Sequence, residues 1–167
     1  MAYRNKTYIA FDGDNDMQYY RVMIAWASNK SIDFDFYDAH ELNYSHDWAQ
    51  TESIKRQLHE RLVNSKLFIL LIGNSTKRLT RFVEYEVETA MRLKIPIICV
   101  NLNGNRQMDS LSPDWFGEYP RVYVSFKEKI IKHAMDNWPT DRNCLYGRGS
   151  YYYNDNVYSS LGISRWE

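Results

Sequence analysis

Short β-rich runs alternate with stretches of helical period along most of this chain, and this alternation constrains the fold more than any other feature. Residues 67–72 (LFILLI) are apolar at every position, which is typical of a central strand covered on both faces. Because crossover helices rather than hairpin turns separate the runs, neighbouring strands are expected to be parallel. The pattern predicts an α/β fold in three layers, with helices on both faces of the sheet.

Five runs are expected to form a flavodoxin-like core, with the last of them a short edge strand. They are residues 7–11, 33–37, 67–72, 95–100 and 122–124. The acidic run Asp12 to Asp16 (DGDND) ends the first strand and can cap the helix that follows. The apolar face of that helix is expected to hold Tyr20, Met23, Ile24 and Ala27.

From Trp138 onward the chain is polar and rich in tyrosine, without a clear period. We therefore divide the sequence into an α/β domain over residues 1–137 and a C-terminal extension over residues 138–167. Left exposed, the aromatic rings of the extension would create a large apolar surface. We expect the extension to pack on the domain or to form an oligomer contact.

Composition and charge exclude several classes of partner. The 21 Lys and Arg residues balance the 21 Asp and Glu residues, so no basic field attracts nucleic acid or an anionic membrane. No stretch approaches the roughly 18 apolar residues that span a bilayer, and the polar N-terminus resembles no secretion signal. We expect a soluble, cytoplasmic protein that binds neither nucleic acid nor membrane.

Glu86 does not fit the helix on which it lies. The helix expected over residues 81–94 has an apolar stripe formed by Val83, Val87, Ala90 and Met91. Glu86 takes the i+3 place in that stripe, where a carboxylate is costly unless something satisfies it, whereas Glu84 and Glu88 are expected to face away. Two interpretations stay open: an arginine or free backbone amides hold the carboxylate, or it is a catalytic group at the carboxyl edge of the sheet.

Other catalytic patterns are missing or weak. No Gly-x-Ser-x-Gly elbow is present, and Cys99 lies in a predicted buried strand, so a nucleophilic enzyme is disfavoured. No metal site is expected either, because the histidines lack the spacing of ligands. The histidines are His40, His46, His59 and His133.

Three segments resemble the TIR family. Arg81 to Ala90 (RFVEYEVETA) resembles the motif in which an aromatic, a small residue, two variable positions, a glutamate and an aliphatic residue open the third helix. Residues 7–11 with Asp12 resemble the first TIR box, and the chain from Asp38 onward resembles the loop after the second strand. The resemblance covers about residues 7–135 and is strongest to the TIR-like proteins of bacterial Thoeris anti-phage systems.

The chain also departs from the family pattern. Phe82 stands where many members have tryptophan, and Val83 stands where many have cysteine. The acidic run replaces the serine usual in the first box. The glutamate of the motif, Glu86, is retained.

The resemblance implies an enzyme that cleaves the nicotinamide–ribose bond of NAD, with NAD as substrate and no cofactor. Glu86 would stabilise the oxocarbenium-like centre of that reaction. Water as acceptor gives ADP-ribose, whereas an adenine nitrogen or a ribose hydroxyl of the same molecule gives a cyclic ADP-ribose isomer. Thoeris relatives make such signals for a separate effector protein, and many TIR enzymes assemble their site by self-association.

Seven further residues are expected to contact the substrate, because they follow strand ends or open helices at the carboxyl edge. They are Phe11, Asp12, Asp38, Trp48, Asn74, Ser75 and Phe82. Each also has a structural interpretation, as a core aromatic, a turn or cap residue, or a loop residue that bonds its own backbone. The alternative function is a TIR-like module that binds partners through exposed loops and has no turnover.

Overall fold

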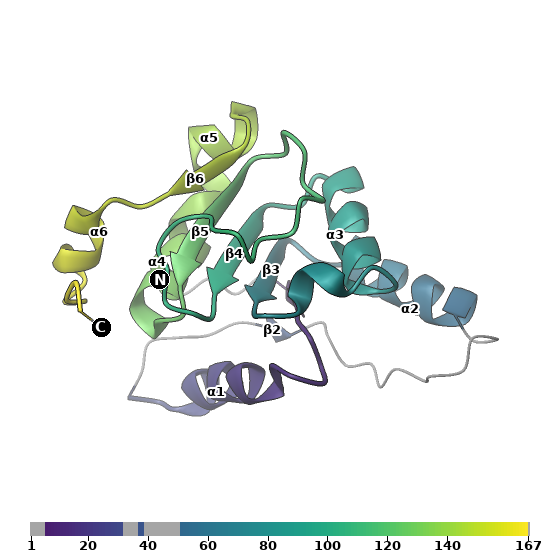
Figure 1. Ribbon diagram of the computed structural model, residues 1–167, viewed down its shortest axis with the longest axis horizontal. Coiled ribbons are helices and arrows are strands. Elements are labelled where there is room, and N and C mark those ends of the chain that lie inside the picture. Colours follow the sequence, from purple (N-terminus) through teal and green to yellow (C-terminus); the bar gives the residue numbers. More distant parts are fainter. Residues whose placement is uncertain (1–5, 32–36, 39–50, 167) are drawn as a thin grey trace.

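The computed structural model describes residues 6–31, 37–38 and 51–166, and over these residues the chain forms one parallel sheet (Figure 1). Its strands are β1 (Lys6–Ala10), β2 (Tyr37–Asp38), β3 (Leu67–Ile72), β4 (Ile97–Asn101), β5 (Arg121–Ser125) and β6 (Ser150–Tyr152). The strand order is β2-β1-β3-β4-β5-β6, and every pairing is parallel. The first five strands have the flavodoxin-like order, so the predicted five-stranded core is confirmed.

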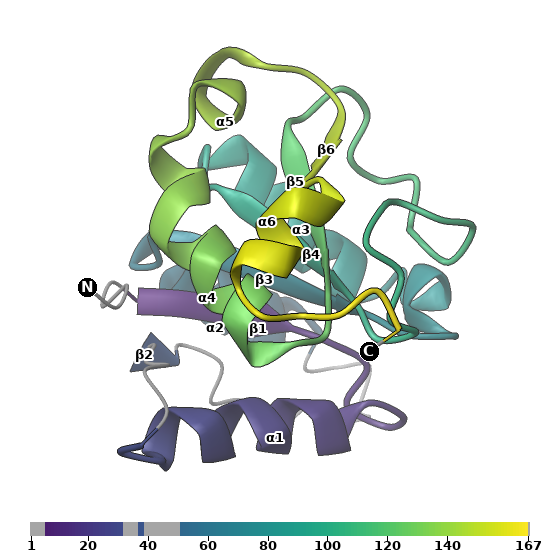
Figure 2. The same ribbon diagram turned by 90° about the vertical axis from the view of Figure 1, so that its left-hand side faces the viewer.

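Helices cover both faces of this sheet. They are α1 (Met17–Ser28), α2 (Thr51–Val63), α3 (Val83–Arg92), α4 (Glu128–Asn137), α5 (Arg142–Tyr146) and α6 (Asp155–Ser160), with short 3-10 turns η2 (Thr76–Arg78) and η3 (Trp138–Thr140). In Figure 2, α4 and α6 lie in front of the sheet and α3 lies behind it. None of the helices in the described ranges is long and apolar enough to cross a membrane.

The alternation of side chains along β3 divides the core into two halves. Leu67, Ile69 and Leu71 face a cluster that contains residues of α1, α4 and α6. The intervening side chains face a second cluster, built with residues of α2 and α3. All six positions of β3 are buried, as its uninterrupted apolar run predicts.

The predicted edge position of the fifth strand is wrong. β5 is buried along its whole length and pairs with β6 on one side and β4 on the other. The reason is that the tyrosine-rich extension supplies β6, a strand too short and too polar for its pattern to be recognised. Residues 33–36 of the second predicted strand lie outside the described residues, and β2 holds Tyr37 and Asp38.

The first helix also differs in detail from its prediction. Met23 is fully buried against the sheet, but Ile24 is 37% exposed, so the buried face is narrower than the apolar pattern suggests. Asp16 occupies the N-cap position of α1, yet its side chain makes no capping hydrogen bond. The capping role expected of the acidic run is therefore not fulfilled by this residue.

The extension is interwoven with the rest of the fold. Trp138, Tyr158 and Ile163 are buried in the same cluster as α4 and the inner strands. Tyr158 also accepts a hydrogen bond from the backbone N–H of Ser125 at the end of β5 (3.2 Å). The domain boundary after residue 137 and the oligomer contact stay predictions.

Candidate functional site

The carboxyl ends of β1 and β3 meet at the topological switch point of the sheet. The chain leaves β1 through α1 toward β2, and it leaves β3 through η2 and α3 toward β4, on the opposite side. Connections that diverge in this way open a crevice outside the strand ends, where α/β proteins bind their ligands. The loop of residues 12–16 and the loop of residues 73–76 form this part of the edge.

Asp12 joins the two loops. The hydroxyl of Ser75 donates to Asp12 Oδ2 (2.6 Å), and the amide of Asn15 donates to the same oxygen (2.7 Å). The backbone N–H groups of Asp14 and Asn15 donate to Asp12 Oδ1, at 3.0 and 3.3 Å. Both oxygens of this carboxylate are thus fully engaged, and the loops are fixed to one another.

The four donors also determine the charge of Asp12. Burial raises the pKa of this carboxyl, but the hydrogen bonds from Asn15, Ser75 and the two backbone amides together outweigh it. The net result is a pKa below the ordinary value of 3.8. Asp12 is therefore a firmly ionised group at neutral pH.

Asp16 is a second buried carboxyl group in the same loop, with 7% of its surface exposed. Its carboxylate lies against Gly73 at the end of β3. A Cβ atom on Gly73 would stand 2.8 Å from Asp16 Oδ1 and closer still to Oδ2, so only glycine leaves room for it. Burial raises the pKa of Asp16 above 3.8, and the negative charge of Asp12 raises it further.

Glu86 lies in the first turn of α3, which begins at the same edge of the sheet because α3 runs back toward the start of β4. Its side chain is 0% exposed, which confirms the burial predicted from the helical stripe. Its backbone N–H donates to the carbonyl of Phe82 (2.8 Å). Glu88 is exposed as expected, whereas Glu84 is half-buried rather than fully solvated.

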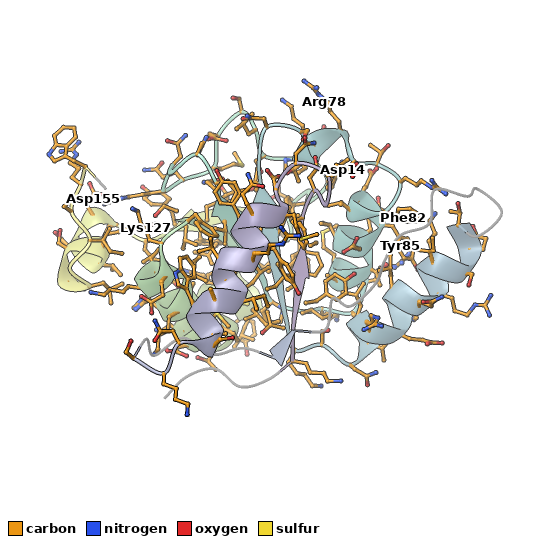
Figure 3. All side chains as sticks on the ribbon, turned by 90° about the horizontal axis from the view of Figure 1, so that it is seen from below. Asp14, Arg78, Phe82, Tyr85, Lys127 and Asp155 are labelled. Carbon is orange, nitrogen blue, oxygen red and sulfur yellow. The ribbon has the colours of Figure 1, made fainter. Side chains whose placement is uncertain are left out.

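The start of α3 is fastened to α2. Arg81, just before α3, donates a hydrogen bond from its guanidinium to the hydroxyl of Thr51, the first residue of α2. The Tyr85 hydroxyl donates to the carbonyl of Lys55 (3.3 Å), and the Lys55 ammonium lies 5.1 Å from the centre of the Tyr85 ring. These contacts hold the first turn of α3, which also carries Glu86. Figure 3 labels Phe82 and Tyr85 on this helix.

The other predicted site residues are spread over several environments. Asp12 and Ser75 are in direct contact, whereas Asn74 is exposed beside them. Phe11 is buried and stacks on Tyr20, with ring centres 4.7 Å apart, and therefore has a packing role that accounts for its ring.

Phe82 is half-buried at the N-cap position of α3, with the Arg81 guanidinium 4.6 Å from its ring centre. Asp38 ends β2 and pairs through its backbone with Thr7 of β1. Trp48 lies outside the described residues.

Sequence reasoning missed three polar groups at this edge. Asn15 and Asp16 belong to the acidic run, which predicts turn and cap residues but not a link to β3. Thr76 is buried, and its hydroxyl accepts a hydrogen bond from the backbone N–H of Gly73 (2.9 Å). No short-range pattern could have indicated contacts that span about sixty residues of sequence, such as Asn15 to Ser75.

Metal ligands are not grouped in this site. Within residues 6–31, 37–38 and 51–166, no set of three or more His, Cys, Asp or Glu side chains is arranged to hold a metal ion. The chemistry available at the described edge is that of carboxylates, hydroxyls and amides.

A parallel sheet in this order is a flavodoxin-like α/β architecture, and a buried glutamate opens its third helix. A family model described as "Thoeris protein ThsB, TIR-like domain" matches residues 8–107, which is more than half of the chain. The chain therefore belongs to the Thoeris ThsB TIR-like family, and this membership associates it with an anti-phage defence system.

Two solved structures show more distant likeness. The CMP N-glycosidase BcmB of Clostridium botulinum aligns with a TM-score of 0.44 and 13% identity, over 79% of this chain and 98% of that chain. A conserved protein from Enterococcus faecalis V583 aligns with a TM-score of 0.43 and 14% identity, over 95% of this chain and 98% of that chain. Similarity at this level bears on neither substrate nor activity.

Proposed function

We propose that this protein cleaves the nicotinamide–ribose bond of NAD and forms a cyclic ADP-ribose isomer as a signal for a separate effector protein. The observation that carries the proposal is Glu86, a wholly buried carboxyl group in the first turn of α3, in a chain of the Thoeris ThsB TIR-like family. A buried carboxyl group at the carboxyl edge of an α/β sheet is a common feature of catalytic sites.

The proposed chemistry needs a negative charge beside the ribose. As the bond from C1′ to the nicotinamide nitrogen breaks, its electron pair leaves with nicotinamide, which departs as a neutral molecule. Positive charge develops on C1′ and the ring oxygen, and the Glu86 carboxylate stabilises it. No acid is needed for the leaving group, and no cofactor takes part.

The residues around the switch point would contact the rest of the substrate. Ser75 and Asn74 offer hydroxyl and amide groups to the ribose or phosphate groups, and Phe82 offers a half-buried ring at the start of α3. Asp12, Asp38, Trp48 and Phe11 remain proposed contacts of the same kind. Self-association is proposed to complete the site, as in other TIR enzymes.

The deciding experiment compares nicotinamide release from NAD by the wild type and by the variants Glu86→Gln and Glu88→Gln. The amide at position 86 keeps the size of the side chain but removes the charge, so we expect turnover to fall by about a hundredfold or more. Glu88 lies two residues away on the same helix and is exposed, so its variant should retain wild-type turnover. Thermal melts establish that both variants fold.

The outcomes separate the enzyme from a binding module. A folded Glu86→Gln protein with full turnover would remove Glu86 from the mechanism. A wild type that releases no nicotinamide, at high protein concentration as well as in dilute solution, would instead favour a TIR-like module that acts by binding partners. Chromatography of the products distinguishes ADP-ribose from a cyclic isomer.

A further inference from the structure

The side chain of Asp16 is not explained by the fold. At the N-cap of α1 an aspartate ordinarily accepts a hydrogen bond from the first turn of the helix, but the Asp16 carboxylate does not. It is more than nine-tenths buried, and its Oδ2 atom makes no hydrogen bond within the described part of the chain. Burying a carboxyl oxygen in this way costs free energy, which suggests a purpose other than stability.

The position of Asp16 places it within the candidate site. Its carboxylate crosses the switch point and packs against Gly73 at the end of β3. The Asp12–Ser75 hydrogen bond links the same two loops. A ligand in the crevice outside these strand ends would meet the loop of residues 12–16 directly. Asp16 is thus a buried carboxyl group, with one oxygen that lacks a hydrogen bond in the described part of the chain, at the place where the fold binds ligands.

Asp12, the neighbouring carboxylate, has no oxygen left to accept a proton or a further hydrogen bond from a ligand. Its two oxygens already accept four hydrogen bonds, and those bonds hold it ionised. Among the described residues, no comparable set of donors contacts Asp16, and its pKa is raised by burial and by the charge of Asp12. A pair of carboxyl groups with pKa values driven apart is the arrangement in which one of them exchanges protons.

The proposed reaction requires a group that exchanges protons. When a hydroxyl group attacks C1′, whether it belongs to water or to a ribose of the same molecule, the new C1′–O bond forms and the hydroxyl proton must leave. The departing nicotinamide is neutral and does not take that proton. A base with a pKa nearer to the working pH than that of an ordinary carboxylate accepts it more effectively.

We propose that the Asp16 carboxylate is the general base that accepts the proton of the attacking hydroxyl group. This assignment rests on the proposed function and adds a second carboxyl group to it: Glu86 stabilises the charge on the ribose, and Asp16 removes the proton. In each turnover the electron pair of the C1′–N bond leaves with nicotinamide, the hydroxyl oxygen bonds to C1′, and its proton moves to Asp16 and then to solvent.

The charged groups around Asp16 determine how its ionisation, and with it the turnover of the enzyme, depends on pH. Asp12 at the end of β1 is the charged group that acts on it, and Gly73 at the end of β3 contributes no charge. Asp14 in the same loop is exposed to solvent. As pH rises, Asp16 loses its proton and becomes a competent base. Because Glu86 must also be ionised to act, the acidic limb of the turnover number is expected to reflect both carboxyl groups.

The test measures the turnover number against pH for the wild type, Asp16→Asn and Asp114→Asn. Asp16→Asn should reduce turnover by about 10²–10⁴-fold, the usual contribution of a general base, and should leave a shallower acidic limb that the ionisation of Glu86 alone accounts for. Asp114 is an exposed carboxyl group in the loop before β5, and its variant should keep both the rate and the limb.

Three other results overturn the assignment. A folded Asp16→Asn protein with the wild-type rate and profile shows that Asp16 is not the base. A slower variant whose acidic limb keeps the slope and position of the wild type shows a structural effect of Asp16 and also refutes the assignment. A wild type without any turnover of NAD removes the proposed function itself, and with it the role of Asp16, whereas the first two results leave the proposed function intact.

Discussion

At the scale of single residues, Asp12 and Asp16 show how environment alone separates two identical side chains. They lie four positions apart, and both are buried. Asp12 is stabilised in its ionised form by four donors, whereas Asp16 faces burial and the charge of Asp12 without such donors. The pKa of Asp12 is lowered and that of Asp16 is raised, so the two residues make opposite contributions to the dependence of stability on pH.

The hydrogen bond from Ser75 to Asp12 gives a prediction for stability. Removing the hydroxyl in Ser75→Ala should lower the free energy of unfolding by about 1.5–3 kcal/mol, the usual range for a hydrogen bond to a charged group. Because the pKa of Asp12 is depressed, its stabilisation is present above pH 3.8 and is lost as pH falls through the lowered value. Urea titrations at pH 7 and at lower pH should therefore show the difference shrinking in acid.

An exposed serine supplies the control for that measurement. Ser53→Ala on α2 makes the same chemical change on the surface and should alter the free energy of unfolding by no more than about 0.5 kcal/mol. Equal effects of the two substitutions at pH 7 would contradict a specific role of the Ser75 hydroxyl.

The Asp16 carboxyl group predicts the opposite dependence of stability on pH. Its pKa is raised in the folded state, so between pH 3.8 and the folded pKa the native protein binds more protons than the unfolded chain, and stability falls as pH rises. Asp16→Asn removes a charge that is costly at neutral pH, and we expect a higher Tm than wild type at pH 7. The advantage should disappear below about pH 3.8, where both states of the wild type are protonated.

Such a result would have a functional meaning as well. A substitution that stabilises the protein while it abolishes turnover is the behaviour expected of a residue retained for activity. A lower Tm of Asp16→Asn at pH 7 would instead mean that the Asp16 carboxylate makes a stabilising contact, which would contradict a net cost of burying its charge.

Sequence reasoning predicted the burial of Glu86 but not that of Asp16, another buried carboxyl group of the site. The 3.6-residue period of α3 was sufficient to predict that Glu86 is buried, because the period fixes which side chains face the sheet. The burial of Asp16 depends on Gly73, more than fifty residues later, and the local pattern of an acidic run before a helix indicates only a cap. Local patterns predict which face of a helix is buried. They do not predict contacts between two loops, because the folded sheet brings those loops together.

At the scale of elements, the β1–α1 loop packs against the end of β3 only because Gly73 has no side chain. Gly73→Ala should push the Asp16 carboxylate out of its place, and overpacking of this kind typically costs about 1–3 kcal/mol. In an Asp16→Ala background the obstruction is gone, so the same change at Gly73 should have little effect. Free energies of unfolding for this double-mutant cycle measure the coupling directly.

A glycine of the β1–α1 loop, Gly13, is the matched control. A Cβ atom on Gly13 would meet nothing within 4 Å, so Gly13→Ala should be tolerated in either background. If Gly73→Ala is as destabilising in the Asp16→Ala protein as in the wild type, the two residues do not act on each other.

The strands with the clearest apolar runs were predicted most accurately. The apolar runs that form β1, β3 and β4 were located to within one or two residues, because buried parallel strands need continuous apolar sequence. β6 was missed, because three residues of a tyrosine-rich segment at the margin of a sheet carry no period. The same omission made β5 an edge strand in the prediction.

At the scale of the whole molecule, the C-terminal extension contributes to the main core. Tyr158 on α6 is 0% exposed, and the Arg106 guanidinium of the loop after β4 lies 4.0 Å from its ring centre. Arg106 also donates hydrogen bonds to Asp155 and to the carbonyl of Ser164. Residues about fifty positions apart are thereby held together, and these contacts add to the buried side chains of Trp138 and Ile163 and to the pairing of β6 with β5.

This arrangement predicts that two tyrosines of the extension differ strongly in their effect on the domain. Tyr158→Ala removes a fully buried ring and the acceptor for the Ser125 backbone N–H, and it should lower the free energy of unfolding by about 3–5 kcal/mol. Tyr146→Ala makes the same chemical change on α5, at a side chain that is 80% exposed. It should change the free energy of unfolding by about 0.5 kcal/mol or less. Denaturant titrations followed by circular dichroism provide both values. If the extension were a separate unit, Tyr158→Ala would leave the main unfolding transition unchanged and add an early, small one; a single transition shifted to lower denaturant is the result expected of one cooperative core.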